Sequence, residues 1–317
     1  MKVGVVAFSL YGFSKDLFDL QNLDEMFKSI ANAGAEAIEI PCLLNSKNCN
    51  LDILLNNRDE LSKFLKLIAD NGLSISALNC CGNPLHPQEE IRIVEIEILK
   101  NVIQLAQKIN VDNVIVFSGC PGSFTGDENA NWIVYPHPKV NIEILKWQWE
   151  KIAIPFWKEI AIYAKKLGIK LCFELHPGNL VYNYDTFINL RNNTNENVGV
   201  NFDPSHFFWQ SIDPLALLHK IKESIFHVHI KDVMFNNFDC SLNGVLANKS
   251  FKEKADRSWI FCTVGRGQSY EFWKCFINTL RLIGYDGVLS IEQEDLLFTF
   301  FEGFRRGVIT LKKLLNE

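Results

Sequence analysis

The sequence predicts an α/β protein in which eight strand–helix units close into a (β/α)8 TIM barrel. Two observations predict this fold. Strand and helix patterns alternate along the chain, and four of the later strands end on side chains that can bind a cation. The chain has 317 residues, which would allow two domains, but α/β barrels of this size are commonly one. We therefore expect a single domain over residues 1–317.

Short apolar runs recur along the chain, and helical patterns fill the intervals between them. The first strand is expected from Val3 to Phe8, followed by a helix near 23–33. Apolar residues at helical spacing predict a helix from Glu89 to Lys108. Asp213 followed by proline is typical of a helix N-cap and first helical position. The strands are expected near residues 3, 35, 73, 112, 170, 197, 225 and 287, and a last helix near 301–315.

Five predicted helices end on a residue that accepts left-handed backbone, immediately before a short apolar strand. This order is typical of the loop that joins a helix to the next strand of an α/β fold. The five residues are Gly34, Gly72, Asn110, Gly168 and Gly284. Their regular recurrence favours the barrel. An open doubly wound sheet is the main competing fold, but it gathers its ligands from a couple of strands and not from four in a row.

Two loops are longer than a typical connection between a strand and a helix. One runs from Gly119 to about Trp147, and the other from Val233 to Gln268. Both follow strand ends at the mouth of the predicted barrel, where they would form walls or lids over a small substrate. Packing or subunit contact explains them equally well.

Four predicted strands share one pattern of alternating faces. Side chains on a strand point alternately to opposite sides, and in these runs one side is large and apolar while the other is small or polar. In a barrel covered by helices the apolar side lies under the helices, and the other side points inward. The last residues of the polar side are Glu174, Asp203, His229 and Glu292.

The convergence of these four side chains predicts a metal site. Three carboxylates crowded together raise one another's pKa values, and a divalent cation relieves that crowding. One imidazole with three carboxylates suits Mn²⁺ first, with Mg²⁺, Co²⁺ or Zn²⁺ as alternatives. A single glutamate at a strand end is more often an ion-pair partner, and a lone histidine more often a core residue. Four strand ends of one parity favour one divalent ion.

The charge balance argues against a nucleic-acid or membrane surface, since the net charge is −5 and basic residues are scattered. No apolar run approaches the ~20 residues that span a bilayer. The nine cysteines contain no CxxC pair, and Met1 leads directly into a predicted strand without a signal peptide. These features favour a reducing, cytoplasmic environment. GxGxxG, P-loop and GxSxG patterns are also missing, so dinucleotide, nucleoside-triphosphate and serine-hydrolase functions lack their usual signals.

Several motifs resemble those of the xylose isomerase-like barrel superfamily and, within it, the bacterial sugar phosphate isomerase/epimerase family. The resemblance covers almost the whole chain. Its marks are the segments Ser76–Asn79, Gly82–Pro87, Phe117–Gly122, Glu174–Gly178, Asn201–His206, His227–Asp232 and Ser290–Glu292.

The resemblance implies a divalent-metal-dependent isomerase or epimerase of a sugar or sugar phosphate. Ketose 3-epimerases of this superfamily hold their metal at positions that match Glu174, Asp203, His229 and Glu292. Their two glutamates exchange protons with a substrate carbon, so Glu174 and Glu292 are the catalytic candidates. His206 matches a histidine that contacts substrate. Candidates for further substrate contacts are Lys231, His86 and Arg257. The expected partner is a small sugar, and a homo-oligomer is compatible with the sequence.

The chain also departs from some members of the superfamily. Endonuclease IV binds three zinc ions through additional histidines, whereas the fourth strand here ends on Ser118 and Cys120, which disfavours a phosphodiesterase acting on DNA. Lys231-Asp232 replaces the Gly-Glu of many ketose epimerases. Inosose dehydratases share the barrel, so a metal-dependent lyase or dehydratase acting on a keto-sugar or inosose is the alternative.

Overall fold

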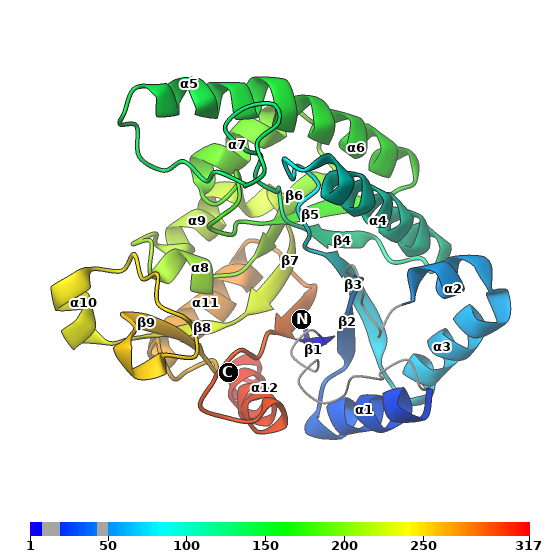
Figure 1. The fold of residues 1–317 in the computed structure, drawn as a ribbon. Coiled ribbons are helices and arrows are strands. Elements are labelled where there is room, and N and C mark those ends of the chain that lie inside the picture. Colours follow the sequence, from blue (N-terminus) through cyan, green and yellow to red (C-terminus); the bar gives the residue numbers. More distant parts are fainter. Residues whose placement is uncertain (8–19, 43–49) are drawn as a thin grey trace. The chain divides into compact units, whose positions relative to one another are not determined.

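Eight parallel strands form a closed barrel in a computed structural model that describes residues 1–7, 20–42 and 50–317 (Figure 1). This confirms the predicted fold. Going round the barrel, the strand order is β1, β10, β7, β6, β5, β4, β3, β2. Their bounds are β1 Lys2–Val6, β2 Ala37–Pro41, β3 Ser74–Cys80, β4 Asn113–Val116, β5 Lys170–Glu174, β6 Val198–Phe202, β7 Ile225–Ile230 and β10 Val288–Ile291. The predicted end of the first strand, Phe8, lies outside the described residues.

Helices occupy the intervals between these strands. Those of the first half are α1 Leu20–Ala33, α2 Leu51–Asn56, α3 Arg58–Asp70, α4 Glu89–Lys108, α5 Val140–Trp147, the π-helical turn η2 Gln148–Ala153 and α6 Ile154–Lys166. Those of the second half are α7 Tyr184–Asn192, α8 Ser205–Phe208, α9 Pro214–Ile221, the short 3-10 turn η3 Lys222–Ser224, α11 Tyr270–Leu282 and α12 Phe300–Leu315. The predicted helix over Glu89–Lys108 is confirmed with the same bounds.

The local signals at helix ends act as the sequence predicts. Asp213 caps α9, and its side chain accepts hydrogen bonds from the backbone N–H groups of Leu215 and Ala216. Asn110 has a φ of 56° and Gly34 a φ of 103°, so both adopt the left-handed backbone that ends a helix. The chain therefore turns from helix to strand at the expected positions.

The described residues form two compact units, and the first comprises residues 1–40, 64–76 and 202–317. In this unit β10 pairs with both β1 and β7, with Leu289 aligned to Val3 and to Val228. These three side chains are fully or almost fully buried. Figure 1 shows α12 beside α1 along the outside of this unit. The aligned apolar side chains leave the alternate, inward positions of β7 and β10 for polar residues.

The second unit comprises residues 41–63 and 77–201. Its strands are in parallel register, with Phe173 of β5 aligned to Val116 of β4 and Val200 of β6. Trp157 of α6 packs edge-on against Phe173, with ring centroids 4.6 Å apart, and donates a hydrogen bond from its indole to the Ser118 carbonyl. Figure 1 shows α2 beside α4 in this unit. The helix-facing side of β5 is thus filled by large apolar groups.

The long segment after β7 contains secondary structure that the sequence analysis treated as a loop. Strands β8 Asp232–Phe235 and β9 Trp259–Cys262 form an antiparallel pair. Helix α10 Asn237–Asn243 and the 3-10 turn η4 Lys254–Asp256 lie between them in sequence. Aromatic packing joins this pair to the end of α8, because Trp209 and Trp259 stack with ring centroids 5.0 Å apart and an interplanar angle of 11°.

Asp232 fastens the end of this hairpin to the next helix. It is fully buried, and one carboxylate oxygen accepts hydrogen bonds from the N–H groups of Gly265 and Gly267 and from the indole of Trp273, at 2.9–3.1 Å. Gly267 must be a glycine here, because an added Cβ would lie 1.9 Å from the Val233 carbonyl oxygen. The carboxylate therefore fixes the loop that leads from β9 into α11.

Replacing Asp232 by Asn should strongly destabilise the protein. The amide nitrogen cannot accept the hydrogen bonds that reach this carboxylate, so buried donors lose their partners at roughly 1–3 kcal/mol each. We expect the free energy of unfolding in urea to fall by at least about 2 kcal/mol. Asp286→Asn is the control, because that side chain is 93% exposed where it pairs with the N-terminal amine. A stability equal to that of the control would contradict the role of Asp232.

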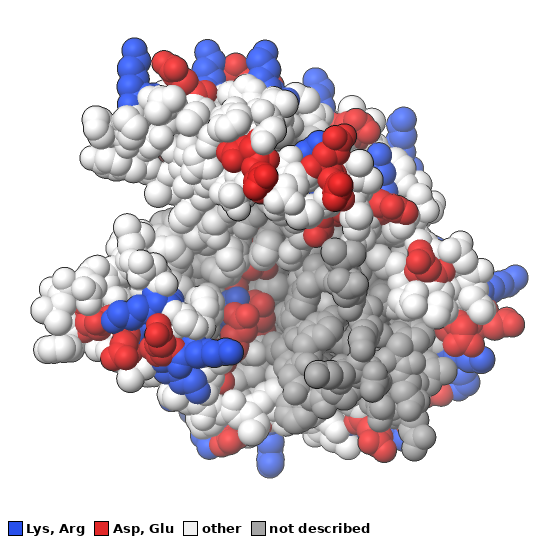
Figure 2. Space-filling view, in the orientation of Figure 1, with Lys and Arg blue, Asp and Glu red and all other residues white. Residues whose placement is uncertain are grey.

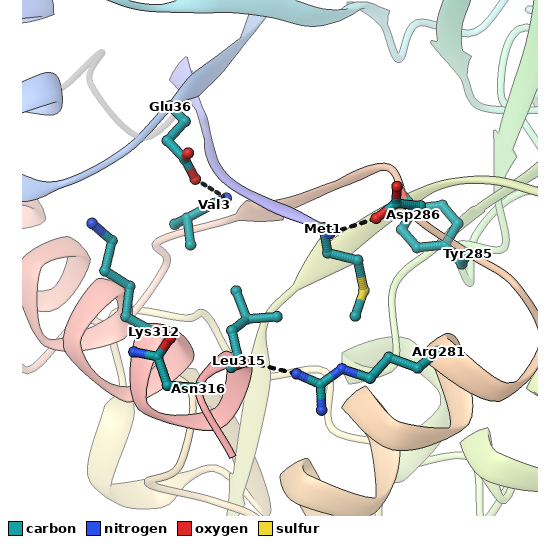
Figure 3. A pocket seen from close by; sticks show the side chains of 9 residues that line it. All are labelled: Met1, Val3, Glu36, Arg281, Tyr285, Asp286, Lys312, Leu315 and Asn316. Atoms are coloured by element: carbon teal, nitrogen blue, oxygen red, sulfur yellow. Dashed lines mark hydrogen bonds and ion pairs between the residues drawn. The ribbon is translucent and has the colours of Figure 1, made fainter.

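A cleft of about 400 Å³ opens where the strands of the first unit begin. Met1 and Val3 line it, with Asp286 close before β10 (Figure 3). The N-terminal amine contacts the Asp286 carboxylate at 2.7 Å, and Arg281 donates to the Leu315 carbonyl. Contacts at this end of a barrel serve stability, whereas chemistry occurs at the opposite end, where the strands finish. The candidate site is therefore not this cleft.

The surface carries both signs of charge. On the face drawn in Figure 2, acidic and basic side chains are interspersed with one another. Within the described ranges, no helix has both the length and the apolar character needed to cross a membrane.

Candidate metal centre

Three of the predicted ligands meet within the first unit. Asp203 follows β6, His229 lies in β7, and Glu292 follows β10. One ligand atom from each side chain lies within 4.8 Å of the others. The Nδ1 atom of His229 is 3.3 Å from a Glu292 carboxylate oxygen. Asp203 and His229 are each only 1% exposed, and Glu292 is half-buried.

Strand alternation explains why these side chains meet. On β7 the side chains of Val228 and Ile230 are buried with the apolar core, so His229 between them points to the opposite side. On β10 Ile291 is buried in the same way, and Glu292 follows it. Ser290 is aligned with His229 across the two strands. The parallel register thus brings the two polar sides to one level of the barrel.

A buried carboxylate lies behind His229. One oxygen of Glu39, in β2, is 2.9 Å from Nε2 of His229 and 3.2 Å from Nε2 of His227. Burial by itself would raise the pKa of Glu39, but the adjacent His229 and His227 hold this pKa below its usual value. Because Nε2 of His229 faces Glu39, its Nδ1 is the nitrogen that faces the ligand carboxylates.

Lys231 places a positive charge among the carboxylates. Its Nζ lies 3.1 Å from Asp203, 2.7 Å from Glu292 and 3.2 Å from Glu294. The side chain is only 3% exposed, and Nζ also lies 4.5 Å from the centre of the Phe261 ring. A lysine buried with several carboxylates offsets part of their mutual repulsion.

His206 lies beside the same carboxylates. It occupies the short helix α8 directly after Asp203, and its Nε2 is 3.3 Å from an Asp203 oxygen. The other Asp203 oxygen accepts a hydrogen bond from the Ser205 N–H at 2.9 Å. Phe261 packs edge-on against the His206 ring, with centroids 5.7 Å apart. The imidazole of His206 is therefore held at the border of the ligand cluster.

Glu174, the remaining predicted ligand, belongs to the second unit. It ends β5, is 3% exposed, and accepts a hydrogen bond from the Asn201 side chain at 2.9 Å. Glu174 and Asn201 are aligned across β5 and β6. Asp203 follows Asn201 by two residues, so the two carboxylates stand at the ends of adjacent strands.

Two residues that the sequence predicts as substrate contacts have other partners in the structure. His86 accepts a hydrogen bond from the Gln88 N–H at 3.1 Å, within the turn before α4. Arg257 is 2% exposed and lies against two aromatic rings, with its guanidinium carbon 4.1 Å from the Phe251 ring centre and 5.0 Å from that of Trp259. Their proposed roles in substrate binding stay predictions.

Three residues of the cluster were missed by sequence reasoning, namely Glu39, Glu294 and Phe261. For Glu39 a signal existed, because it alternates with the buried Ile38 and Ile40 just as the ligands alternate with their apolar neighbours. Phe261 lies in β9, which was treated as a loop. Glu294 lies beyond the end of the last barrel strand, although it has the same parity as Ser290 and Glu292.

The end of β4 carries no histidine, as the sequence shows. The Ser118 hydroxyl accepts a hydrogen bond from the Val181 N–H at 2.9 Å. Cys120 is buried, and burial raises the pKa of its thiol to about 12. A thiol that keeps its proton is a poor metal ligand, because the thiolate is the ligating form.

Cys120 should therefore resist alkylation in the folded protein, whereas the exposed Cys275 should react. Iodoacetamide at mildly alkaline pH, followed by peptide mass spectrometry, measures both sites in one sample. Denatured protein provides the control, in which both thiols should be labelled. Labelling of Cys120 at the rate of Cys275 without unfolding would contradict the burial and the raised pKa.

The barrel and its cluster of carboxylates and imidazole define a protein of the α/β-barrel class with a candidate metal centre at the strand ends. The model of one family within that class matches residues 27–308. The chain belongs to this family, the xylose isomerase-like TIM barrel.

Two relatives represent the sequence similarity. The Bacillus subtilis (strain 168) uncharacterized protein YfiH is 34% identical over 299 residues, which cover 93% of this chain and 95% of that protein. An inosose dehydratase from Geobacillus kaustophilus (strain HTA426) is 29% identical over 99 residues, or 31% of this chain and 32% of the dehydratase. The second similarity therefore concerns about a third of each chain.

Two solved structures show the same fold. A D-tagatose 3-epimerase-like protein is 22% identical with a TM-score of 0.65, and the alignment covers 100% of this chain and 97% of that one. The IOLI protein with a binding zinc atom is 18% identical with a TM-score of 0.66, and the alignment covers 100% and 98%. At these identities the likeness concerns the fold.

Proposed function

We propose that this protein is a divalent-metal-dependent isomerase or epimerase of a sugar or sugar phosphate. The observation that carries the proposal is the group of Asp203, His229 and Glu292, whose ligand atoms lie within 4.8 Å of one another. We propose Glu174 as the fourth ligand, because it ends the strand next to that of Asp203. That residues 1–317 act as one domain is part of the same proposal.

The donor set fits a divalent metal. Carboxylate oxygens with one imidazole nitrogen suit Mn²⁺, Mg²⁺, Co²⁺ or Zn²⁺, and Mn²⁺ remains our first choice. The hydrogen bond from His229 to Glu39 is the kind of outer contact that orients ligating histidines. A zinc atom is present in the similar IOLI structure. When bound, such an ion polarises a carbonyl group and stabilises negative charge on oxygen.

The chain's own residues would then move the proton. Glu292 is half-buried, and its carboxylate contacts Lys231 and His229. These contacts hold the carboxylate in place at the cluster. We assign it, with Glu174, to the removal and return of a proton at the carbon beside the substrate carbonyl. Epimerisation requires a base on each side of that carbon, and two glutamates satisfy this need. Lys231 and His206 would bind substrate oxygens on which negative charge grows.

A dehydratase is the second candidate, favoured by the sequence similarity to inosose dehydratase. Its first step would be the same removal of a proton beside a carbonyl. The hydroxyl group of the next carbon would then leave as water, with the proton that the base had taken. The buried ammonium of Lys231 offers a cation near such a leaving group. The two candidates share their base and differ in their product.

Asp203→Asn should weaken divalent-metal binding, because a neutral amide is a poorer ligand for a hard cation. Loss of a hydrogen-bond partner of a metal ligand typically weakens metal binding about 10–100-fold, so loss of a ligand itself should weaken it at least as much. Competition with a chromophoric chelator measures the dissociation constant for Mn²⁺ and Zn²⁺. Glu36→Gln is the control, because Glu36 is exposed and bonds the Val3 N–H.

Glu174→Gln tests the fourth ligand separately in the same assay. Affinities of the Asp203→Asn and Glu174→Gln variants equal to that of the Glu36→Gln control would rule out these ligands.

Heavy water should introduce deuterium into a ketose or inosose substrate at the carbon beside the carbonyl. The proton taken by a glutamate can exchange with solvent before it returns, even where net conversion is slight. Glu292→Gln should slow this exchange by at least about 10²-fold, because an amide cannot accept the proton. Mass spectrometry and NMR of the recovered sugar measure the label.

The product then separates the two candidates. Deuterium in a recovered diastereomer supports an epimerase, and deuterium with an unsaturated or dehydrated product supports a dehydratase. Turnover without any solvent label at carbon would remove the proton-transfer role from the glutamates.

A further inference from the structure

The barrel holds a second layer of polar side chains, behind the candidate ligands. Glu39, His227 and Ser290 point inward from three strands, and none is more than 1% exposed. Burying a carboxylate costs several kcal/mol unless partners compensate it. The proposed chemistry uses none of these three side chains directly. Their complete burial therefore calls for a role that involves the layer above them.

The hydrogen bonds of this layer determine which nitrogen of His229 carries a proton. The Nε2 atoms of His229 and His227 lie 2.9 and 3.2 Å from the same Glu39 oxygen, and because an ionised carboxylate only accepts, these contacts require a proton on each Nε2. A neutral imidazole with a proton on Nε2 has its lone pair on Nδ1. In His229 this is the atom 3.3 Å from Glu292.

His227 contacts the same Glu39 oxygen as His229, and Ser290 contacts His227. The Ser290 hydroxyl lies 3.0 Å from Nε2 of His227, and the two imidazole rings stand nearly perpendicular, at 83°. Gly4 in β1 lies close to β10, because an added Cβ would lie 2.4 Å from the Val288 side chain and 3.1 Å from the Ser290 hydroxyl oxygen. The carboxylate is thus held between two rings and has little freedom to turn away from His229.

We propose that Glu39 is a positioning residue for the metal centre, which keeps the proton of His229 on Nε2 and thereby presents Nδ1 to the ion. His227, supported by Ser290, holds Glu39 in that position. The inference rests on the proposed metal-dependent function, and it adds the side chain that selects the ligating nitrogen. Outer carboxylates of this kind also raise the basicity of a ligating imidazole.

A competing arrangement uses the same atoms. Glu39, His227 and His229 could themselves hold a cation, since their ligand atoms also lie within 4.8 Å of one another. The distances favour hydrogen bonds, because 2.9 and 3.2 Å are ordinary N–H···O separations. An Nε2 atom that donates a proton to Glu39 cannot ligate a metal at the same time.

NMR of protein with isotope-labelled histidine tests the proton position directly. In the metal-free and the Zn²⁺-loaded wild-type protein, Nε2 of His229 should carry a proton. Zn²⁺ should change the signal of Nδ1. An unprotonated Nε2 in His229, or two bound zinc ions per chain with both Nε2 atoms ligating, would overturn the proposal. This measurement needs no substitution and no catalytic assay.

Glu39→Gln tests the consequence for metal binding. The variant should bind Zn²⁺ about 10–100-fold more weakly than wild type, and His229 should show a mixture of the two neutral tautomers. Glu36→Gln, a change of the same kind three residues earlier, should match wild type in both measurements. Circular dichroism checks that each variant is folded. If Glu39→Gln does not fold, the NMR experiment on the wild-type protein still tests the proposal.

The failure of the inference can be told from the failure of the proposed function. Tight Zn²⁺ binding by wild type and equally tight binding by Glu39→Gln would refute the positioning role alone. A wild-type protein that binds neither Mn²⁺ nor Zn²⁺ would refute the metal-dependent function itself.

Discussion

Charge compensation inside the barrel is the constraint on which the candidate site depends. Carboxylates withdrawn from water are tolerated only when cations or hydrogen-bond donors face them. The structure meets this condition in two layers: Lys231 contacts Asp203, Glu292 and Glu294, and two imidazoles contact Glu39. Since each layer supplies partners to the next, no member can be exchanged for an apolar residue without exposing another to an uncompensated environment.

The antiparallel pair of β8 and β9, with its aromatic side chains, contributes to this charge compensation from outside the barrel. Phe261 lies over the ammonium of Lys231 and against the edge of His206, so it limits water around both groups. Its own position follows from stacking on Phe251, with the rings inclined by only 14°. A lower local polarity strengthens the attraction between Lys231 and its carboxylates. The segment after β7 thus influences the electrostatics of strands to which it is not paired.

Much of the fold and part of the site could be predicted because both depend on local periodicity. The helix-ending glycines and the alternation of His229 with Val228 and Ile230 are visible in the sequence alone. Glu39 obeys the same alternation, but a single glutamate in an apolar strand carries no sign of the histidines that it meets nearly 190 residues later. Phe261 and Glu294 acquire their roles from contacts with residues distant in sequence, Lys231 for both and His206 for Phe261, which no local spacing encodes.

The attachment of the β8–β9 hairpin through Asp232 has a consequence for how freely the sequence of this segment can change. The carboxylate begins β8 and bonds the backbone shortly after β9, so both ends of the intervening chain are tied to one buried point. The stretch between them can change in length or composition while the barrel strand before it and the helix after it keep their places. A foreign loop grafted at the same two junctions should therefore leave the barrel in place.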